Sequence, residues 1–378
     1  MTKSNVKSNL RTLLWIALGA LMAGCGSPAP ISATSPFATP TTLLASATFA
    51  PTATSIPLAD GTFLEKTDAN EIRVVSYNVN WDSIFPSEDA NNDDLRSFNR
   101  ATSFQRMMRA LLPDILCLQE INPQRDPDDV AMFLDGIVDV DGNQNWQAVI
   151  ARDMLIATHF DLKPDGFEMK ASSGIPGLNQ AAALIELPEQ YGGGGFYAIC
   201  AHFKSGSEIS DERMRQRQAD ALMNHLRDAT SLGGGFDLPA GTPFVILGDF
   251  NIYDVESNRL LTTMLTGDID NEAVYGNDFL PDWDQTVLAE VAPSHNALGI
   301  DFYTWRDDGE PFVPGVLDHI LFSDSLLKPV RSFILDSLQI TDAGLDSLGL
   351  QKTDVLLETD PLNFDHLPLV VDLVLVNN

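Results

Sequence analysis

Acidic, amide and imidazole side chains stand beside several apolar runs of this sequence, in types that could bind a cation and move protons. The run Phe244–Leu247 is followed closely by Asp249 and Asn251. An apolar run between Pro and Gly predicts a buried strand, and polar groups just past a strand end lie where α/β proteins keep their chemistry. A turn is the simpler alternative, because Gly, Asp and Asn favour turns for local backbone reasons. The choice depends on whether other strands bring similar groups to the same place.

Five further runs carry polar groups at one end. Three of them end in a polar residue: Ile72–Val75 leads to Asn78, Ile115–Leu118 to Glu120, and Phe196–Ala201 to His202. Two begin with polar residues: Asp318 precedes Ile320–Phe322, and Asp365 with His366 precedes Leu369–Leu375. If all six polar ends meet at one edge, the last two strands run antiparallel to the others. This predicts mixed sheets and excludes a plain doubly wound parallel sheet.

Helical spacing and turn residues separate these runs. Apolar periodicity predicts helices from Phe98 to Leu111, from Asp211 to Leu226, and over Leu260–Leu265. The four glycines at 192–195 predict a hairpin loop, because they lack the lysine and the following helix of a phosphate-binding loop.

The chain divides into three predicted parts. Lys3, Lys7 and Arg11 precede the apolar stretch Leu13–Leu21, and Cys25 follows Leu-Met-Ala-Gly, which resembles a bacterial lipoprotein signal over residues 1–24. An ordinary signal peptide with an incidental Cys is the alternative. A retained transmembrane helix is less expected, because the apolar stretch is shorter than the about 20 residues that such a helix needs. Residues 25–58 form an uncharged tether rich in Ser, Thr, Pro and Ala, and residues 59–378 form one predicted catalytic domain.

The acidic balance and the cysteines set further limits. The net charge of −30 comes from 53 acidic against 23 basic residues, which argues against strong, sequence-independent affinity for DNA. It does not exclude a phosphoester substrate, because a bound divalent cation supplies local positive charge. Cys117 and Cys200 lie inside apolar runs, where they would pack as small reduced side chains or pair between neighbouring strands.

Six short motifs lie in a fixed order between Glu71 and Leu375: SYNVN, CLQE, AHFKSG, GDFN, LDHILFS and FDHLPLV. In these motifs the chain resembles the endonuclease/exonuclease/phosphatase superfamily, which includes DNase I-like nucleases, sphingomyelinases and inositol polyphosphate 5-phosphatases. Each motif alone is weak, but all six fall on the predicted edge. The resemblance implies an α/β fold of the DNase I type, with two packed mixed β-sheets flanked by helices. The sequences HFKSG and GDFNIYD together look most like those of the secreted bacterial nuclease branch.

The resemblance also implies metal-dependent hydrolysis of phosphate esters, which needs an activated water, a cation and help for the leaving oxygen. Mg²⁺ is the expected cofactor, with Mn²⁺ or Ca²⁺ as alternatives. The implied metal residues are Glu120, Asn78 and Asp365. The implied catalytic residues are His202, Asp249, Asn251, Asp318 and His366.

Each implied catalytic residue has an expected role. Asp249 would orient or deprotonate the attacking water, and Asn251 would hold a phosphate oxygen. Asp318 would fix the tautomer of His366 by accepting from its second ring nitrogen, while His366 bonds the phosphate or the nucleophile. His202 would lie on the opposite side of the phosphate and would stabilise the transition state or protonate the leaving oxygen.

Other residues carry less information. Three histidines without a partnered pattern are interpreted as surface or packing residues: His159, His225 and His295. His319 points to the other strand face from Asp318. Arg213 and Gln218 resemble positions that buttress this family's site, although a solvated helix face also explains Arg213. Asn80 stands where several relatives carry Asp, which leaves a second metal position open. The stretch DVDGN at 139–143 is not a calcium loop, because Ile150 stands where an EF-hand needs Glu.

The predicted function is a metal-dependent phosphodiesterase, and within that class a nuclease acting on DNA or RNA outside the cytoplasmic membrane. A phosphatase or sphingomyelinase-like phospholipase C is the alternative that the acidic charge favours. A binding lipoprotein without catalysis is the alternative of another class, against which the complete acid, base and metal set argues. The expected partners are a phosphoester substrate, with nucleic acid bound weakly, and the cell membrane or cell surface through lipidated Cys25. No obligate protein partner is inferred.

Overall fold

The structure, a computed structural model, describes residues 57–85, 96–138, 145–163, 180–253, 259–307, 312–355 and 364–376, with only the backbone of 96–99. The described residues belong to one compact unit that spans Ser55–Asn378. The predicted signal, Cys25, most of the predicted tether and the stretch 139–143 lie outside the described residues.

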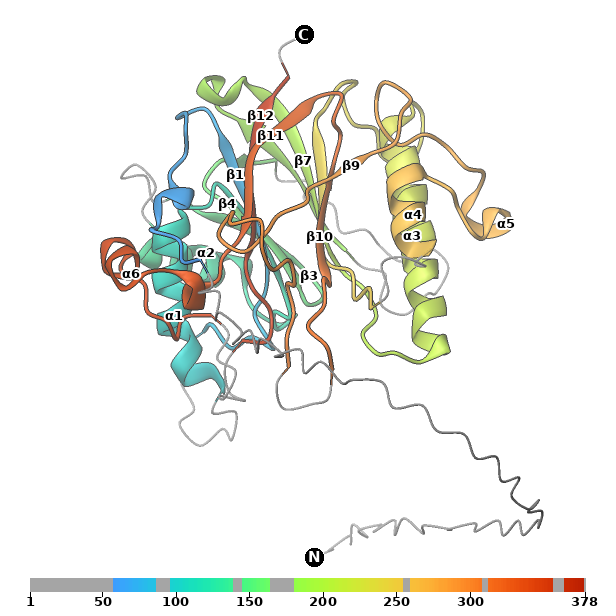
Figure 1. Ribbon diagram of the computed structural model, residues 1–378. Helices are drawn as coiled ribbons and strands as arrows, with labels where there is room; N and C mark the ends of the chain where they lie inside the picture. Colours follow the sequence, from blue (N-terminus) through green and yellow to red (C-terminus); the bar gives the residue numbers. More distant parts are fainter. Residues whose placement is uncertain are drawn as a thin grey trace, which may run out of the picture. The chain divides into compact units, whose positions relative to one another are not determined.

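Two six-stranded sheets form the centre of this unit (Figure 1). Across the first sheet the strands are β11 (Leu327–Ile334), β12 (Leu369–Leu375), β1 (Ile72–Asn78), β2 (Ile115–Gln119), β4 (Met154–Thr158) and β3 (Gln147–Ala151). Across the second sheet they are β5 (Asp161–Leu162), β6 (Ala181–Leu187), β7 (Gly194–His202), β8 (Phe244–Asp249), β10 (Asp318–Phe322) and β9 (Ala289–Glu290).

Strand direction places the polar ends together. β1 is parallel to β2, and β7 is parallel to β8 with His202 opposite Asp249. β12 runs antiparallel to β1, and β10 runs antiparallel to β8 with Asp318 opposite Asp249. Both sheets are therefore mixed, which confirms the prediction drawn from the reversed order of apolar and polar residues.

The inner faces of the two sheets pack against each other. β1 and β2 contact β8, while β2 and β4 contact β7. The strands β1, β2, β4 and β8 are buried along their whole length, as expected for runs of Val, Ile and Leu covered on both faces. This inner core holds the two sheets, and the site at their common edge, in one orientation.

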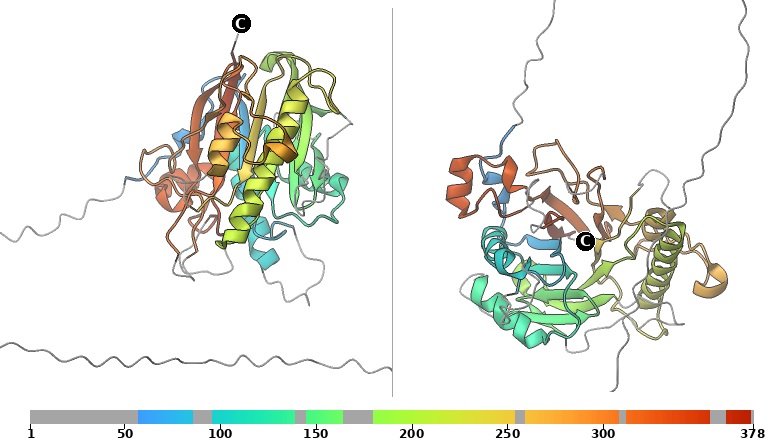
Figure 2. Two further views of the ribbon diagram at one scale, coloured as in Figure 1. Left: turned by 90° about the vertical axis from the view of Figure 1, so that its right-hand side faces the viewer. Right: turned by 90° about the horizontal axis from the view of Figure 1, so that it is seen from below.

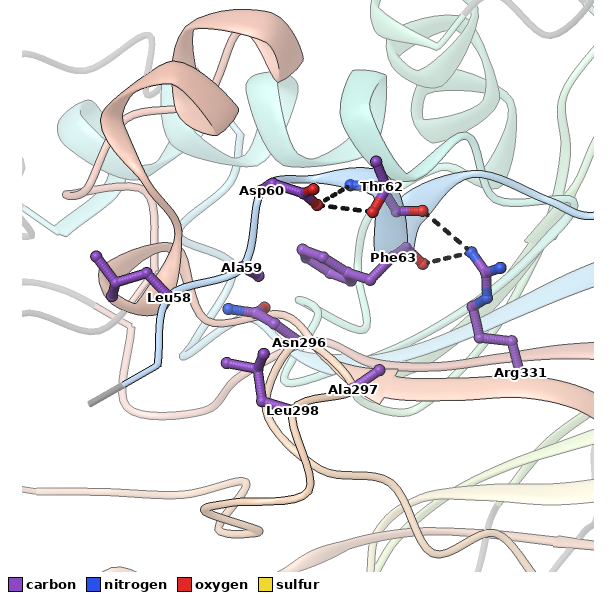
Figure 3. Close-up of a pocket in the computed structure, with 9 residues that line it drawn as sticks. All are labelled: Leu58, Ala59, Asp60, Thr62, Phe63, Asn296, Ala297, Leu298 and Arg331. Atoms are coloured by element: carbon purple, nitrogen blue, oxygen red, sulfur yellow. Dashed lines mark hydrogen bonds between the residues drawn. The ribbon is translucent and has the colours of Figure 1, made fainter. Parts of the chain in front are cut away.

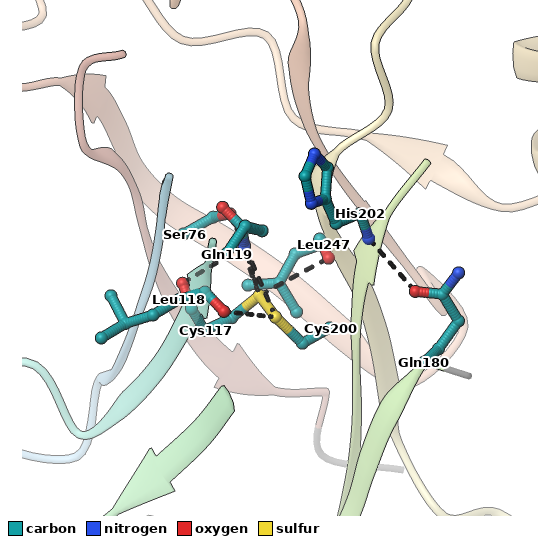
Figure 4. The surroundings of a disulfide bond; sticks show 8 residues. All are labelled: Ser76, Cys117, Leu118, Gln119, Gln180, Cys200, His202 and Leu247. Carbon is teal, nitrogen blue, oxygen red and sulfur yellow. Dashed lines mark hydrogen bonds between the residues drawn. A yellow bond between two sulfur atoms is a disulfide. The ribbon is translucent and has the colours of Figure 1, made fainter. Parts of the chain in front are cut away.

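A disulfide joins Cys117 on β2 to Cys200 on β7, and Figure 4 shows it between the two sheets. Of the two alternatives left by the sequence, the paired state is the one present. The bond links opposite sheets rather than neighbouring strands of one sheet. Cys117 precedes Glu120 by three residues and Cys200 precedes His202 by two, so the bond lies directly behind the predicted site.

Helices cover the outer faces of the sheets, as both views in Figure 2 show. The α-helices are α1 (Arg96–Leu111), α2 (Pro127–Ile137), α3 (Ile209–Thr230), α4 (Arg259–Thr266), α5 (Glu272–Tyr275) and α6 (Asp342–Leu348). Short 3₁₀ turns are η1 (Thr62–Leu64), η2 (Glu189–Tyr191) and η3 (Ser337–Gln339). None of the helices within the described ranges combines the length and hydrophobicity that a bilayer-spanning segment needs.

The three predicted helices correspond to α1, α3 and α4. The helix α2 was not predicted, although Asp126 caps it through the Asp128 N–H and Pro127 stands at its start. The glycine stretch lies at the connection between the antiparallel strands β6 and β7, as predicted for a hairpin, but Gly194 and Gly195 already belong to β7.

Candidate active site

The polar strand ends meet around the carboxylate of Asp249, which is 2% exposed. Asp249 Oδ2 accepts a hydrogen bond from Asn78 Nδ2 at 3.1 Å. The same oxygen lies 3.7 Å from His202 Nε2 and 3.6 Å from His366 Nε2. The structure therefore brings four of the predicted residues, from both sheets, to one point.

A tight backbone turn positions Asp249 and Asn251. Gly248 has a φ of 140°, and a Cβ atom there would lie 1.9 Å from the Ala201 carbonyl oxygen, so only glycine fits. Asn251 is left-handed with a φ of 52°, and its N–H donates to Asp249 Oδ1 at 2.8 Å. Asn251 Nδ2 donates to the Phe203 carbonyl at 3.0 Å. The segment is thus a turn and part of the site at once.

The two histidines each have an aspartate behind them. His366 Nδ1 lies 2.7 Å from Asp318 Oδ2, and both residues are buried. This contact has the geometry expected from the resemblance, with Nε2 of His366 turned toward Asp249. Burial disfavours protonation of His366, but the charges of Asp318 and Asp249 and the hydrogen bond to Asp318 raise its pKa to about 10.

His202 has an equivalent partner that the sequence did not reveal. Its Nδ1 lies 2.8 Å from Asp153 Oδ2, in the turn between β3 and β4. Burial disfavours protonation, but the hydrogen bond to Asp153 and the charges of Asp249, Asp153 and Glu120 raise the pKa of His202 to about 9. The Asp153 carbonyl accepts from the Ile121 N–H at 2.9 Å, which ties this turn to the segment that carries Glu120.

Asp249 is ionised at neutral pH, although its pKa lies above the usual range for aspartate. Burial raises its pKa to about 6, while the neighbouring His366 and His202 oppose this rise. At neutral pH the centre therefore has one carboxylate between two imidazolium groups. Such a set can take a proton on one side and release a proton on the other, which is the requirement for general acid and base catalysis.

Glu120 directly follows β2 in a left-handed conformation with a φ of 64°. Its Oε1 atom accepts from Asn78 Nδ2 at 3.1 Å, so the Asn78 amide joins the Glu120 and Asp249 carboxylates. Asn78 Oδ1 accepts from the Asn80 N–H at 3.0 Å. The following turn contains three consecutive left-handed residues from Asn80 to Asp82, a strained backbone of the kind that clusters at functional sites.

Two carboxylate oxygens near this centre have unsatisfied capacity. Asp365 Oδ1 and Asp318 Oδ1 are buried and accept no hydrogen bond within the described structure. Buried anionic oxygens of this kind fit a cation, because Mg²⁺ takes one or two protein carboxylates and keeps several waters. In the described part of the chain, no group of three or more His, Cys, Asp or Glu side chains is arranged to hold a metal ion by itself.

The loop after His202 is supported from α3. Gln218 Oε1 accepts from the Lys204 N–H at 2.9 Å, and Arg215 Nη1 donates to the carbonyls of Lys204 and Gly206 at 2.8 and 2.7 Å. Gln218 therefore does buttress the site. The basic residue in that position is Arg215 and not Arg213, which is exposed on the other side of the helix.

The remaining histidines lie outside the centre. His159, His225 and His295 contact Asp114, Tyr197 and Asp336 respectively, which agrees with a packing role. His319 Nδ1 lies 2.6 Å from Glu290 Oε1 and its ring stacks on Phe250, so it supports the back of the turn that carries Asp249.

A separate pocket of about 500 Å³ lies away from these residues, between residues 58–63, the segment 296–298 and Arg331 on β11 (Figure 3). Arg331 Nη1 donates to the Phe63 carbonyl at 2.8 Å, and the Thr62 N–H donates to Asp60 Oδ1 at 3.0 Å. These polar groups of the lining bond to the protein itself, and none of the predicted site residues lines this pocket.

Several solved structures are similar to this chain at low sequence identity. The catalytic domain of human nocturnin with bound sulfate is 18% identical, with 81% of this chain and 95% of that chain covered and a TM-score of 0.45. An endonuclease/exonuclease/phosphatase from Bacteroides vulgatus is 15% identical, with coverages of 81% and 99% and a TM-score of 0.49. One from Beutenbergia cavernae is 16% identical, with coverages of 81% and 72% and a TM-score of 0.44.

Comparison with curated protein sequences gives no significant match. The sequence profile of the Endonuclease/Exonuclease/phosphatase family, by contrast, matches residues 75–342. This range includes Asn78, Glu120, His202, Asp249 and Asp318, and it covers more than half of the chain. The fold is the DNase I-like sandwich expected from the motifs. By its sequence profile, the chain belongs to the endonuclease/exonuclease/phosphatase family, whose members are phosphoester hydrolases.

Proposed function

We propose that this protein is a divalent-metal-dependent phosphodiesterase, and specifically a nuclease that acts outside the cytoplasmic membrane. The observation that carries the proposal is the pair of His–Asp contacts on either side of the buried Asp249 carboxylate. A binding protein has no need for one base between two protonated imidazoles, whereas phosphodiester hydrolysis uses all three.

The protonation states suggest how these residues divide the reaction. Asp249 takes a proton from water, the water oxygen bonds to phosphorus, and the bond from phosphorus to the leaving oxygen breaks. His202, protonated below a pKa of about 9, gives its proton to the leaving oxygen. His366, oriented by Asp318, donates to a phosphate oxygen from Nε2. Asn251 Nδ2 has a second hydrogen, beyond the one donated to Phe203, for another phosphate oxygen.

Glu120 and Asp365 would hold the cation, with Asn78 beside them. A bound Mg²⁺ would offset the charge that builds up on the phosphoryl oxygens. Support comes from the unsatisfied Asp365 Oδ1 and from the Glu120 carboxylate, which accepts from the Asn78 amide beside the centre. Asn78 bonds both carboxylates through Nδ2, so its role beside the cation would be to hold Glu120 and Asp249 at fixed positions.

A substrate panel tests the proposal. Plasmid DNA, RNA, sphingomyelin and inositol phosphates are each incubated with the protein in Mg²⁺ and in excess EDTA. We expect cleavage of DNA or RNA in Mg²⁺ only, loss of cleavage in Asp249→Asn, and normal cleavage in Asp161→Asn, which changes an exposed carboxylate on β5. Cleavage of only small or lipid phosphoesters would instead support the second candidate, a phosphatase or phospholipase C, which the net charge of −30 favours.

The disulfide supports a location outside the cytoplasm. Cys117 and Cys200 are bonded and buried, and disulfides persist mainly in oxidising compartments. The signal-like residues 1–24 and the Cys25 that follows them point the same way, and lipidation of Cys25 would hold the protein on a membrane.

A further inference from the structure

Three aromatic rings form a row at the edge of the candidate active site. The rings of Tyr253 and Trp305 are 6.5 Å apart and nearly perpendicular, and the rings of Trp305 and Phe312 are 6.0 Å apart. Tyr253 is 46% exposed and Phe312 is 56% exposed, while Trp305 between them is half-buried. The row therefore presents aromatic surface to solvent rather than to the core.

The row begins at the catalytic residues. The Tyr253 hydroxyl donates to Asn251 Oδ1 at 3.4 Å. Trp305 pairs with His366 through a backbone bridge, and the next N–H, that of Arg306, donates to the Asp365 carbonyl at 2.9 Å. A substrate with its phosphate at Asp249 would have its neighbouring groups over these rings.

The first two residues of the row are held in place before any substrate binds. The guanidinium of Arg215 lies 5.5 Å from the centre of the Tyr253 ring, and Arg215 is itself buried and bonded to two backbone carbonyls. Trp305 is held by paired backbone hydrogen bonds with Gly315, at 3.0 Å each. Because these contacts already order the Tyr253 ring and the Trp305 backbone, little conformational entropy is lost there when a planar group stacks on the row.

Electrostatic attraction to phosphates can contribute little to the affinity of this protein for a nucleic acid. With 53 acidic against 23 basic residues, the protein gains little from releasing phosphate counterions. Stacking of bases on aromatic side chains contributes about 1–3 kcal/mol per base and does not depend on net charge. In a duplex the faces of the bases are covered by their neighbours, so this contribution is open only to an unpaired strand.

We propose that the row of Tyr253, Trp305 and Phe312 stacks the bases of an unpaired strand beside the scissile phosphate, so that the protein binds single-stranded nucleic acid in preference to duplex. The inference rests on the proposed phosphodiesterase function and names the substrate form for it. A lipid surface is the competing occupant, because Val313 continues the apolar surface beyond Phe312 and is 83% exposed.

Binding is measured apart from cleavage, by fluorescence anisotropy in Mg²⁺ with the Asp249→Asn protein. The probes are a labelled oligothymidylate, an abasic oligonucleotide of equal length and charge, and the oligothymidylate paired with its complement. We expect the unpaired thymidylate to bind at least about tenfold more tightly than the other two. Its Kd should rise less than about tenfold between 50 and 200 mM salt, because few phosphates are neutralised.

Variants locate the contact. In the same background, Tyr253→Ala and Phe312→Ala should each raise the Kd for oligothymidylate by about 5- to 150-fold and leave the Kd for the abasic strand unchanged. Tyr253→Phe keeps the ring and should restore binding. Phe302→Ala is the matched control, since Phe302 is 53% exposed and has no ring contact with the row in the described structure. Circular dichroism melts show whether each variant is folded.

Three results would overturn the inference. One is equal affinity for the abasic strand, and another is equal affinity for the duplex. The third is loss of binding to sphingomyelin–phosphatidylcholine vesicles in Phe312→Ala with no change for oligothymidylate, which assigns the row to a membrane. Cleavage by the unaltered protein at saturating substrate keeps these results separate from the parent proposal. If the abasic and thymidylate strands bind equally while the unaltered protein cleaves DNA or RNA, only the stacking inference fails, and if it cleaves neither DNA nor RNA, the nuclease proposal fails.

Discussion

In the proposed reaction Asp249 is the base, and its two histidine neighbours differ in what they can do. His366 is buried with its aspartate, while His202 and its partner Asp153 are both half-buried. The more accessible imidazole suits the leaving group, which must depart from the site with the proton. The buried imidazole suits a fixed contact with phosphate.

The pH profile tests this division. We expect kcat/KM to rise as Asp249 ionises through a pKa of about 6 and to fall as His202 loses its proton through about 9. Asp153→Asn keeps a hydrogen-bond acceptor but removes the charge, so the alkaline limb should move to lower pH. Asp161→Asn is the control and should leave both limbs in place. An alkaline limb that does not move in Asp153→Asn contradicts the assignment of His202 as the acid.

The contact between Asp318 and His366 is best tested by a double-mutant cycle. His366→Ala should lower kcat by about 10²- to 10⁴-fold, the usual range for a positioned proton-transfer group. Asp318→Asn should also lower kcat, and the double variant should be scarcely slower than His366→Ala, because residues that act as a unit are strongly non-additive. Fully multiplicative losses, measured on folded samples of matched thermal stability, would refute the unit.

The cation requirement is tested at Glu120. Glu120→Gln removes one charge from a site with few protein carboxylates, so it should raise the Mg²⁺ concentration needed for half-maximal activity by about tenfold or more. Glu290→Gln is a matched control, because Glu290 bonds His319 behind the site and should not change Mg²⁺ dependence. An unchanged Mg²⁺ titration in Glu120→Gln would exclude this residue as a ligand.

At the scale of elements, β2 and β7 each carry a site residue at one end and a bonded cysteine a few residues before it. The cross-link closes a loop of 83 residues in sequence, and loops of this length lose considerable entropy in the unfolded chain when they are closed. Gln119 Nε2 donates to Cys117 Sγ at 2.8 Å, so the bond is also tied to the last residue of β2. The disulfide thus stabilises the two strands that position Glu120 and His202.

Loss of this bond should be visible in unfolding. We expect the Cys117→Ala/Cys200→Ala protein to be less stable by about 2–5 kcal/mol in guanidinium titrations. A reductant should lower the midpoint of the unaltered protein and of Cys25→Ala, but not that of the double variant. If mass spectrometry shows that the bond is reduced while the midpoint stays the same, the stabilising role is wrong.

The sequence was sufficient to predict the site residues that adjoin clearly predicted strands. Asp249 and His366 adjoin long apolar runs, so both the fold edge and the candidate residues could be predicted together. Asp153 could not, because it occupies a two-residue turn between β3 and β4, strands that the sequence analysis did not identify, and it lies 49 residues from His202. The signal that could have identified Asp153 is a carboxylate in a tight hairpin turn.

Other misses came from geometry that a linear pattern does not contain. Arg213 and Arg215 are two residues apart, which on an α-helix is a rotation of about 200°, so the choice between them decides which one reaches the loop after His202. Pairing of Cys117 with Cys200 depends on the register of one sheet over the other. That register is set by packing of the whole core and not by any local motif.

At the scale of the whole molecule, charge, cross-link and the N-terminal region bear on where the protein works. A chain with 53 acidic against 23 basic residues gives weak attraction for polyanions, so a second means of keeping the enzyme near its substrate or near the cell is useful. The predicted tether of residues 25–58 contains no charged residue, and Cys25 at its start offers the one lipid attachment that the sequence predicts.

The final prediction separates anchoring from export. If Cys25 carries lipid, the unaltered protein should partition into detergent, and Cys25→Ala should appear in the soluble extracellular or periplasmic fraction with unchanged specific activity. Ser27→Ala is the matched control beside it and should stay with the membrane. Export is read independently by labelling free thiols under denaturing conditions, and Cys117 and Cys200 should be unreactive in both fractions because the oxidised pair forms outside the cytoplasm. A Cys25→Ala protein that remains membrane-bound refutes the anchor, whereas reactive thiols at Cys117 and Cys200 in the isolated membrane protein refute the oxidising location even if the anchor holds.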